Sequence, residues 1–347
     1  MLRVGIAGIG FMGMIHYLAY QKVAGVQVTA ISSRDPKKRA GDWRGIQGNF
    51  GPPGEEMDLG GIRAHETIEE LLANPDVDIV DVTLPPFRHA EVAIQALEAG
   101  KHVFCEKPLT LDADSAANVV AVAKRCDRIL LVGHVLPFFP EYQWARSVVN
   151  GGEYGKLLGG HFRRTISEPT WLPDYWVPEK VGGPMLDLHV HDAHFIRYLF
   201  GMPKSVRTQG RMRGDCAESW MTFFAYDDPG LLVSASSGTI GQQGRPFLHG
   251  FEIHLERATL AFEFAVLGEE GKYHCQPTLF AEDGSVSHPE LGDGDPINAF
   301  INQLTEVTEC VTSGNTSPIL GGDLAGDAIT LCHLQTESLR QRKSIPV

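Results

Sequence analysis

The first third of the chain alternates short apolar runs with segments in which apolar residues recur at helical spacing. Short apolar runs bounded by turn residues predict buried strands, and the segments between them predict helices. This alternation is typical of βαβ units, in which a parallel sheet carries helices on both faces. The predicted strands cover residues 2–9, 26–32, 77–84, 101–107 and 128–134, and the predicted helices cover Met12–Val23, Glu66–Leu72, His89–Ala99 and Ala113–Arg125.

The pattern changes after residue 134. Strand-like segments separated by turn residues follow one another, and two helical segments close the chain, which predicts a mainly antiparallel sheet with helices on one face. Because 347 residues are many for one core, we expect two domains, an α/β Rossmann domain over 1–133 and an α+β domain over 134–347. The later strands are predicted at 157–164, 205–212, 218–226, 231–239, 249–256, 258–266 and 272–280, and the helices at 297–313 and 323–342.

A segment rich in Gly and Pro, residues 41–61, interrupts the first domain. It is too long and too broken for a tight connection between two elements. We favour a solvated insertion. The alternative is a flap near a bound cofactor, carrying Trp43 and Phe50.

Composition narrows the class of partner. The formal net charge is −13, which argues against a nucleic acid or an anionic membrane surface, since phosphate binding favours a basic stripe. No apolar run has the length of a transmembrane helix, and the apolar N-terminus predicts a buried strand instead of a signal peptide. The six cysteines are scattered without a CxxC pair, which favours reduced thiols in the cytoplasm over a disulfide or zinc framework.

The stretch GIAGIGFMG contains a G-x-G-x-x-G pattern at Gly8, Gly10 and Gly13. Here it follows a predicted strand and opens a predicted helix, which is the context of a dinucleotide-binding loop. The three glycines permit a tight turn, close approach of the backbone to a pyrophosphate, and close packing of helix and strand. The N–H groups of the first helical turn, which includes Phe11 and Met12, would face the phosphates.

The end of the second strand indicates which dinucleotide binds. An acidic residue there would bind the ribose 2′-hydroxyl of NAD. The chain instead has Ser33 followed by Arg34, a pair that can hold the 2′-phosphate of NADP. We favour NADP, and Asp35 keeps NAD open.

The stretch MLDLHVHDAH, residues 185–194, concentrates histidines and aspartates. If one helix runs from Met185 to Phe200, Asp187, His191 and His194 lie within roughly 60° of one another, and His189 and Asp192 point elsewhere. Three interpretations remain: a metal triad, polar residues that satisfy one another, and a catalytic acid–base group. The regular helix separates the three histidines, so we expect no metal.

Three segments resemble the Gfo/Idh/MocA family, which includes glucose–fructose oxidoreductase and inositol dehydrogenase. The first is the N-terminal GIGFMG. The second is Glu106-Lys107-Pro108 at the end of a predicted strand, and the third is the stretch from Gly182 to His191, similar to the family's GG…D-x-x-x-H. Pro85 followed by His89 is similar to its T-P-x-x-x-H segment.

The resemblance implies a Rossmann domain followed by a domain whose large open sheet often forms an oligomer interface, here a dimer or tetramer. It implies hydride transfer between nicotinamide and a secondary alcohol of a sugar, inositol or polyol. Lys107 matches the EKP lysine, Asp187 the motif aspartate and His191 the motif histidine. His191 would be the general base, Asp187 would orient it, and Lys107 would stabilise alkoxide charge. Pro85, His89 and Glu106 would belong to the cofactor side.

Two departures bear on the substrate. The family often has Arg shortly after the position of His134, where this chain has Val135 and Leu136, and His189 replaces a frequent Gly. Candidate substrate-lining residues are His194, Trp171 and Tyr175, the last two as rings that could stack on a sugar. Two alternative functions remain: an NAD-dependent glycoside hydrolase that oxidises a sugar transiently, and a non-catalytic ligand sensor on the same fold.

Overall fold

The computed structural model describes residues 1–48, 50–170, 172, 174–292 and 294–347. The chain divides into two compact units, Met1–Phe139 with Gly294–Gly326, and Pro140–Asp293 with Asp327–Val347. The domains expected from the sequence, 1–133 and 134–347, divide the chain near the same place. A single boundary does not describe the return of residues 294–326 to the first unit.

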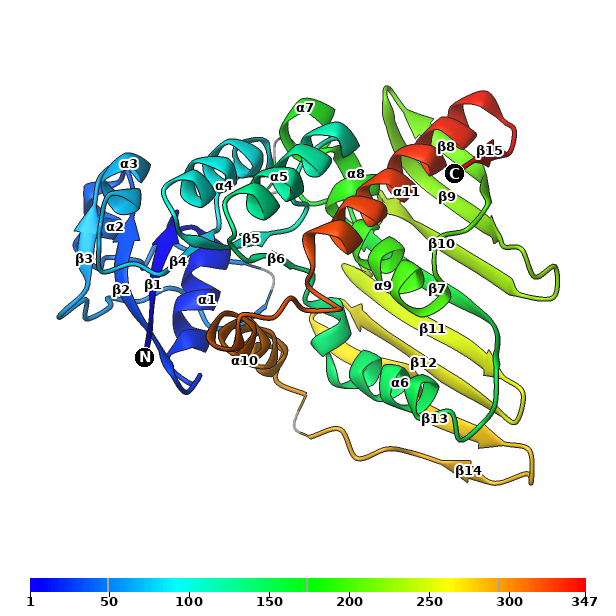
Figure 1. Ribbon diagram of the computed structural model, residues 1–347. Helices are drawn as coiled ribbons and strands as arrows, with labels where there is room; N and C mark the ends of the chain where they lie inside the picture. The colour runs from blue at the N-terminus through cyan, green and yellow to red at the C-terminus, as the bar shows by residue number, and fades with distance from the viewer. Residues whose placement is uncertain (49, 171, 173, 293) are drawn as a thin grey trace. The chain divides into compact units, whose positions relative to one another are not determined.

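The first unit is built on a six-stranded parallel sheet with the order β3-β2-β1-β4-β5-β6 (Figure 1). This confirms the predicted Rossmann sheet. The strand order reverses between β1 and β4, and open sheets of this kind bind ligands at the carboxyl ends of the strands beside that reversal. The strands are β1 Leu2–Ala7, β2 Val26–Ser32, β3 Arg63–His65, β4 Ile79–Val82, β5 His102–Glu106 and β6 Leu130–Gly133.

The central strands are buried on both faces, so their sequences read as nearly continuous apolar runs. Ile6 and Val80 have no exposed surface. The helices are α1 Phe11–Tyr20, α2 Pro36–Arg39, α3 Ile68–Leu72, α4 His89–Glu98, α5 Ala113–Arg125 and α10 Ile297–Ser313, with 3₁₀ turns η1 Pro86–Arg88 and η2 Leu136–Phe138. Side chains cap the starts of α2, α3 and α5, as where Asp112 accepts from the N–H of Ser115 at 2.7 Å.

The second unit is built on a nine-stranded sheet with the order β14-β13-β12-β11-β7-β10-β9-β8-β15. Neighbouring strands are antiparallel except β7 and β10, which are parallel. The predicted, mainly antiparallel sheet is therefore confirmed. Its strands are β7 Leu157–Ser167, β8 Ser205–Arg213, β9 Cys216–Ala225, β10 Leu232–Ile240, β11 Phe247–Leu255, β12 Ala258–Leu267, β13 Glu270–Ala281, β14 Val286–Ser287 and β15 Ile345–Pro346.

Helices cover one face of this second sheet (Figure 1). The ring of Tyr142 in α6 stacks on His249 of β11 and packs against Phe251 and Phe262, which are buried. Successive side chains of a strand point to opposite faces. On the face away from the helices, β9 exposes Met221 and Phe223. No helix among the described residues is long and apolar enough to cross a membrane. The helices of this unit are α6 Pro140–Gly151, α7 Pro178–Val181, α8 Gly183–Asp187, α9 Val190–Phe200 and α11 Gly322–Gln341, whose first residues belong to the first unit.

Candidate functional site

The loop between β1 and α1 has the geometry expected of a phosphate-binding loop. Gly8 has a φ of +106°, a conformation that L side chains rarely adopt. A Cβ on Gly13 would lie 2.3 Å from the carbonyl oxygen of Gly8, so a larger residue would force helix and strand apart. A Cβ on Gly10 would have no neighbour within 4 Å. Gly10 precedes α1 without any side-chain cap, which leaves this helix end open to an anion.

Phe11 and Met12 form the start of α1, and both are half-buried. The Phe11 ring packs edge-on against Phe50 with 4.8 Å between centroids, and Phe50 stacks on Phe300 of α10 at 5.5 Å. Because the Phe11 ring belongs to this aromatic cluster, the backbone N–H groups are what this turn offers to a phosphate.

The interpretation of residues 41–61 as a solvated insertion holds for most of the described part of the segment, which is exposed or half-buried, but not for the side chains of Trp43 and Ile46. Trp43 is fully buried, its ring packs edge-on against Tyr17 of α1 at 5.0 Å, and its Nε1 donates to the carbonyl of Lys38 at 2.9 Å. Burying the indole ring offsets part of the entropy lost in ordering an otherwise irregular segment. The segment thus packs against α1, beside the phosphate-binding loop.

Cationic side chains gather after β2, in and before the short helix α2. Lys38 Nζ donates to the carbonyl of Ile9 in the phosphate-binding loop at 2.7 Å, and Arg39 donates to the carbonyl of Ser33 at 2.7 Å. Arg34 is exposed. Asp35 is the acidic residue that leaves NAD as the alternative dinucleotide. Its side chain accepts from the N–H of Lys37 at 2.9 Å and caps α2.

The EKP segment lies at the carboxyl end of β5, two strands from β1 along the same edge. Lys107 is half-buried, and Glu106 is 6% exposed. Oε2 of Glu106 accepts from the backbone N–H of Lys107 at 3.1 Å. The phosphate-binding loop and Lys107 therefore share the edge at which such sheets bind ligands.

His89 and Pro85, predicted cofactor-side residues, flank the 3₁₀ turn after β4. His89 is buried, with Nδ1 2.7 Å from the carbonyl oxygen of Pro108 and Nε2 2.6 Å from that of Leu84. Both ring nitrogens thus face backbone carbonyls. The ring ties the turn after β4 to the EKP segment, which is an indirect role at this edge.

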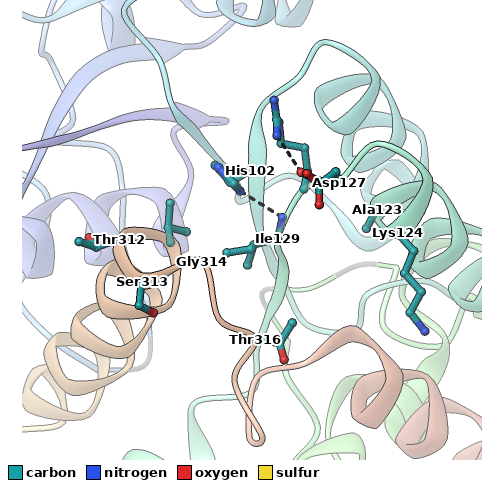
Figure 2. Close-up of a pocket in the computed structure, with 11 residues that line it drawn as sticks. His102, Ala123, Lys124, Asp127, Ile129, Thr312, Ser313, Gly314 and Thr316 are labelled. Carbon is teal, nitrogen blue, oxygen red and sulfur yellow. Dashed lines mark hydrogen bonds between the residues drawn. The ribbon is translucent and has the colours of Figure 1, made fainter.

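A surface pocket of about 540 Å³ lies at the other edge of the first sheet. His102, the first residue of β5, lines it together with Ile129, Lys124 and the end of α10 (Figure 2). In Figure 2 the ring of His102 accepts from the N–H of Ile129, at 3.1 Å. Because His102 begins β5 and Ile129 directly precedes β6, the pocket is not part of the carboxyl edge that carries Lys107.

We expected the histidine-rich stretch of the second unit to form one regular helix from Met185, and this was wrong. α8 ends at Asp187 and α9 begins at Val190. The N–H of His189 bonds to the carbonyl of Pro184, five residues back, at 3.1 Å. This local widening is a π-type turn, a feature found often at functional sites.

Burial separates the polar residues of this stretch into two groups. From Gly183 to Ile196, Asp187 and His191 are the only side chains that are not buried. His194, a predicted substrate-lining residue, is fully buried, as are His189 and Asp192. The two residues proposed for acid–base chemistry are therefore the two that a ligand can reach.

The buried group anchors α9 to the sheet. Arg164 of β7 donates to Asp192 at 2.6 and 3.2 Å. His189 contacts the Ser237 hydroxyl at 2.8 Å and Oε1 of Gln335 at 3.0 Å. Burial lowers the pKa of His189 to about 4, so this ring is neutral. His189 and Asp192 are thus satisfied by residues outside the stretch instead of by one another.

Sequence reasoning missed the partners of this anchor. Alternation along β7 places Arg164 on the same face as the buried Phe162. A charged residue at a buried position of a strand needs a partner, and that signal could have revealed Arg164. Among the described residues, no three His, Cys, Asp or Glu side chains gather as a metal ion requires.

The aromatic residues expected to stack on a sugar ring do not belong to the stretch that carries Asp187 and His191. Tyr175 is 1% exposed, and its hydroxyl hydrogen-bonds to Thr239 at 2.9 Å; burial raises its pKa above the ordinary value. A ring buried to this degree offers little surface for stacking on a sugar. Trp176 donates to Glu168 at 2.7 Å. Trp171 lies outside the described residues.

Comparison with known families and proteins gives the same two parts. Residues 2–134 match the family described as "Oxidoreductase family, NAD-binding Rossmann fold", and residues 142–274 match the "GFO/IDH/MocA C-terminal domain". The chain is 31% identical over 255 residues to dTDP-3,4-didehydro-2,6-dideoxy-alpha-D-glucose 3-reductase of Saccharopolyspora spinosa, which covers 72% of this chain and 70% of the reductase. It is 25% identical over 358 residues to myo-inositol 2-dehydrogenase of Thermotoga maritima, covering 99% and 98% of the two chains.

Other matches are partial or rest on the fold. An uncharacterized oxidoreductase of Streptococcus pneumoniae is 29% identical over 231 residues, which covers 66% of this chain and 58% of that protein. Levoglucosan dehydrogenase, solved in complex with NADH and levoglucosan, superposes with a TM-score of 0.80 at 20% identity, over 100% of this chain and 99% of that one. At this identity the likeness concerns the fold alone.

Proposed function

Because the chain belongs to the oxidoreductase family that joins an NAD-binding Rossmann fold to a GFO/IDH/MocA C-terminal domain, we propose that it transfers a hydride between nicotinamide and a secondary alcohol or ketone of a sugar, inositol or related polyol. Relatives named for myo-inositol and levoglucosan support this substrate class. The observation that carries the proposal is the selective accessibility of Asp187 and His191 in an otherwise buried stretch.

In the oxidation direction, the hydroxyl proton of the substrate goes to His191. An imidazole is the side chain best suited to accept a proton near neutral pH. Asp187 lies four residues before His191 and is accessible like it, so that its carboxylate would stabilise the imidazolium that forms. The anchor formed by Arg164 and Asp192 holds α9 in place, so the base is positioned without reorganisation.

The dinucleotide would be held in the first unit. The open side of Gly10 and the uncapped start of α1 fit a pyrophosphate. When bound, the nicotinamide ring supplies or accepts the hydride. Lys107 donates a hydrogen bond to the reacting oxygen and stabilises its developing negative charge.

We propose NADP as the preferred dinucleotide. Asp35 is engaged in capping α2, and the exposed guanidinium of Arg34 stands with Lys38 and Arg39 around the end of β2. A cluster of cations favours a 2′-phosphate over a bare ribose hydroxyl.

We also propose a homo-oligomer in the cytoplasm. The sheet face opposite the helices exposes 47% of Met221 and 51% of Phe223, and apolar side chains gathered on an exposed sheet face favour contact with a second copy. The six cysteines are all free thiols, which supports a reducing compartment.

The test is a screen of inositols, sugars and sugar derivatives for a change in nicotinamide absorbance with NADP and NAD. Lys107→Met and His191→Asn are each expected to lower kcat on the order of a hundredfold or more. His102→Asn, at the edge of the first sheet opposite to Lys107, serves as the matched control. Retention of hydride transfer within a few-fold in either site variant would overturn the assignment. Cofactor that stays bound while a glycoside is cleaved, with no net absorbance change, would favour the glycoside hydrolase alternative.

A further inference from the structure

Three ionisable side chains are buried together beneath the carboxyl edge of the first sheet. His16 of α1 lies between Asp81 of β4, 2.9 Å from its Nδ1, and Glu106 of β5, 3.2 Å from its Nε2. His16 and Asp81 have no exposed surface and Glu106 has 6%. The rings of Phe104 and Phe300 lie 5.5 and 5.9 Å from the imidazole, so the cluster is shielded from water by apolar groups.

The charge state of the cluster follows from its composition. Burial alone would lower the pKa of His16, but the carboxylates of Asp81 and Glu106 outweigh it and raise this pKa to about 10. At neutral pH His16 is therefore an imidazolium between two carboxylates. Burial raises the pKa of Asp81 as well, and the His16 cation opposes that shift. Tyr20 and Cys105, which interact with the same carboxylates, stay neutral at this pH because burial raises their pKa values well above the ordinary ones.

The cluster reaches Lys107 through Glu106. One carboxylate oxygen, Oε2, accepts from the backbone N–H of Lys107 at 3.1 Å. The other, Oε1, faces His16 and has no hydrogen-bond partner among the described residues. Gly133 at the end of β6 leaves room for this carboxylate, since a Cβ there would lie 2.7 Å from Oε1. Oε1 and Nε2 of His16 lie 3.2 Å apart, an ion-pair contact without hydrogen-bond geometry. Glu106 is thus held by charge on the His16 side and by the backbone N–H of Lys107 on the other.

We propose that His16 is a positioning residue for Lys107: it holds the Glu106 carboxylate, and that carboxylate holds the backbone from which the Lys107 side chain extends. The inference rests on the proposed function in giving Lys107 a role in hydride transfer. It adds that the position of the Lys107 ammonium depends on the ion pair between His16 and Glu106. His16 belongs to α1, the helix that follows the phosphate-binding loop. A small displacement of a catalytic group can cost on the order of a hundredfold in rate.

The test compares two double variants, His16→Gln/Asp81→Asn and His16→Leu/Asp81→Asn. Each removes one cation and one carboxylate, so the cluster keeps the single negative charge that it has in the wild type. The glutamine amide can donate to Glu106 and the leucine side chain cannot, which is the only intended difference. We expect the leucine variant to have a kcat on the order of ten- to a hundredfold lower than the glutamine variant, with KM for the dinucleotide within about twofold.

A second readout on the same proteins requires no activity. Hydrogen exchange of the Lys107 amide, measured by NMR without dinucleotide, is expected to be on the order of tenfold faster in the leucine variant, because its acceptor is no longer fixed. Equal exchange rates and equal kcat values in the two variants would overturn the proposal. If Lys107→Met retains activity, the proposed function fails, and the exchange comparison still decides whether His16 fixes this backbone.

The charge state can be tested on the wild type in case the leucine variant does not fold. Nitrogen-15 NMR of the histidine rings is expected to show both nitrogens of His16 protonated at pH 8. A neutral His16 ring at that pH would contradict the ion-pair bridge on which the positioning depends.

Discussion

The guanidinium of Arg164 forms a two-pronged contact with the carboxylate of Asp192, from Nε at 2.6 Å and from Nη2 at 3.2 Å. The side chains are 5% and 1% exposed. Asp192 directly follows His191, so a buried ion pair fixes the turn of α9 that presents the proposed base. Stability and catalytic geometry are therefore linked at adjacent residues.

Removing one partner of this ion pair should strongly destabilise the folded protein. Arg164→Met leaves the Asp192 carboxylate buried without its cation, and we expect the free energy of unfolding to fall by about 3–5 kcal/mol. Arg164→Met/Asp192→Leu removes both charges and should recover most of the loss. Urea denaturation of the three proteins measures the difference. A single variant within about 1 kcal/mol of the wild type would show that the pair is not the anchor described here.

The phosphate-binding loop allows stability and binding to be separated. Gly10→Ala adds a methyl group where no atom lies within 4 Å, so the variant should fold normally but bind dinucleotide on the order of tenfold or more weakly, because the methyl group stands where the pyrophosphate would approach. Gly13→Ala places its methyl group 2.3 Å from the carbonyl oxygen of Gly8 and should lower the melting temperature as well. Fluorescence titration and thermal unfolding distinguish the two effects. Unaltered binding by the Gly10 variant would place the dinucleotide elsewhere.

Cofactor preference should depend on Arg34. Arg34→Ala is expected to raise Kd for NADP about tenfold, which is about 1.4 kcal/mol, and to leave Kd for NAD nearly unchanged. Arg44→Ala is the matched control, because that guanidinium pairs with Asp42 in the neighbouring segment. Equal loss of affinity for both dinucleotides in the Arg34 variant would contradict the preference for NADP.

Much of the fold was predictable because strand and helix periods are local signals. The helix expected at Ala113–Arg125 and the strand expected at 26–32 have those bounds in the structure. The return of residues 294–326 to the first unit was not predictable. A helix pattern shows that one face is buried, and it does not show against which sheet.

The site was predictable where a motif fixes the backbone, and less so where burial decides. The glycines of the phosphate-binding loop and Lys107 lie at one sheet edge as expected. A regular helix would place Asp187, His191 and His194 on one side. The π-type turn at His189 shifts Asp187 relative to α9, and burial removes His194 from the accessible side. Asp81, an acid inside a buried strand, was the overlooked signal for the ion pair with His16.

Acid sensitivity should follow from His189, which is buried and neutral. Its pKa in the folded protein is lowered by burial to about 4, below the ordinary value of about 6.5, so the unfolded chain binds the proton more readily between these two values. The stabilisation is complete above pH 6.5 and is lost as the pH falls toward 4, at about 1.4 kcal/mol for each pH unit. His189→Gln removes this titration, so the gap in unfolding free energy between wild type and variant should narrow between pH 7 and pH 5, as measured by urea denaturation. A gap that stays constant over this range would mean that burial does not keep His189 neutral in the folded protein.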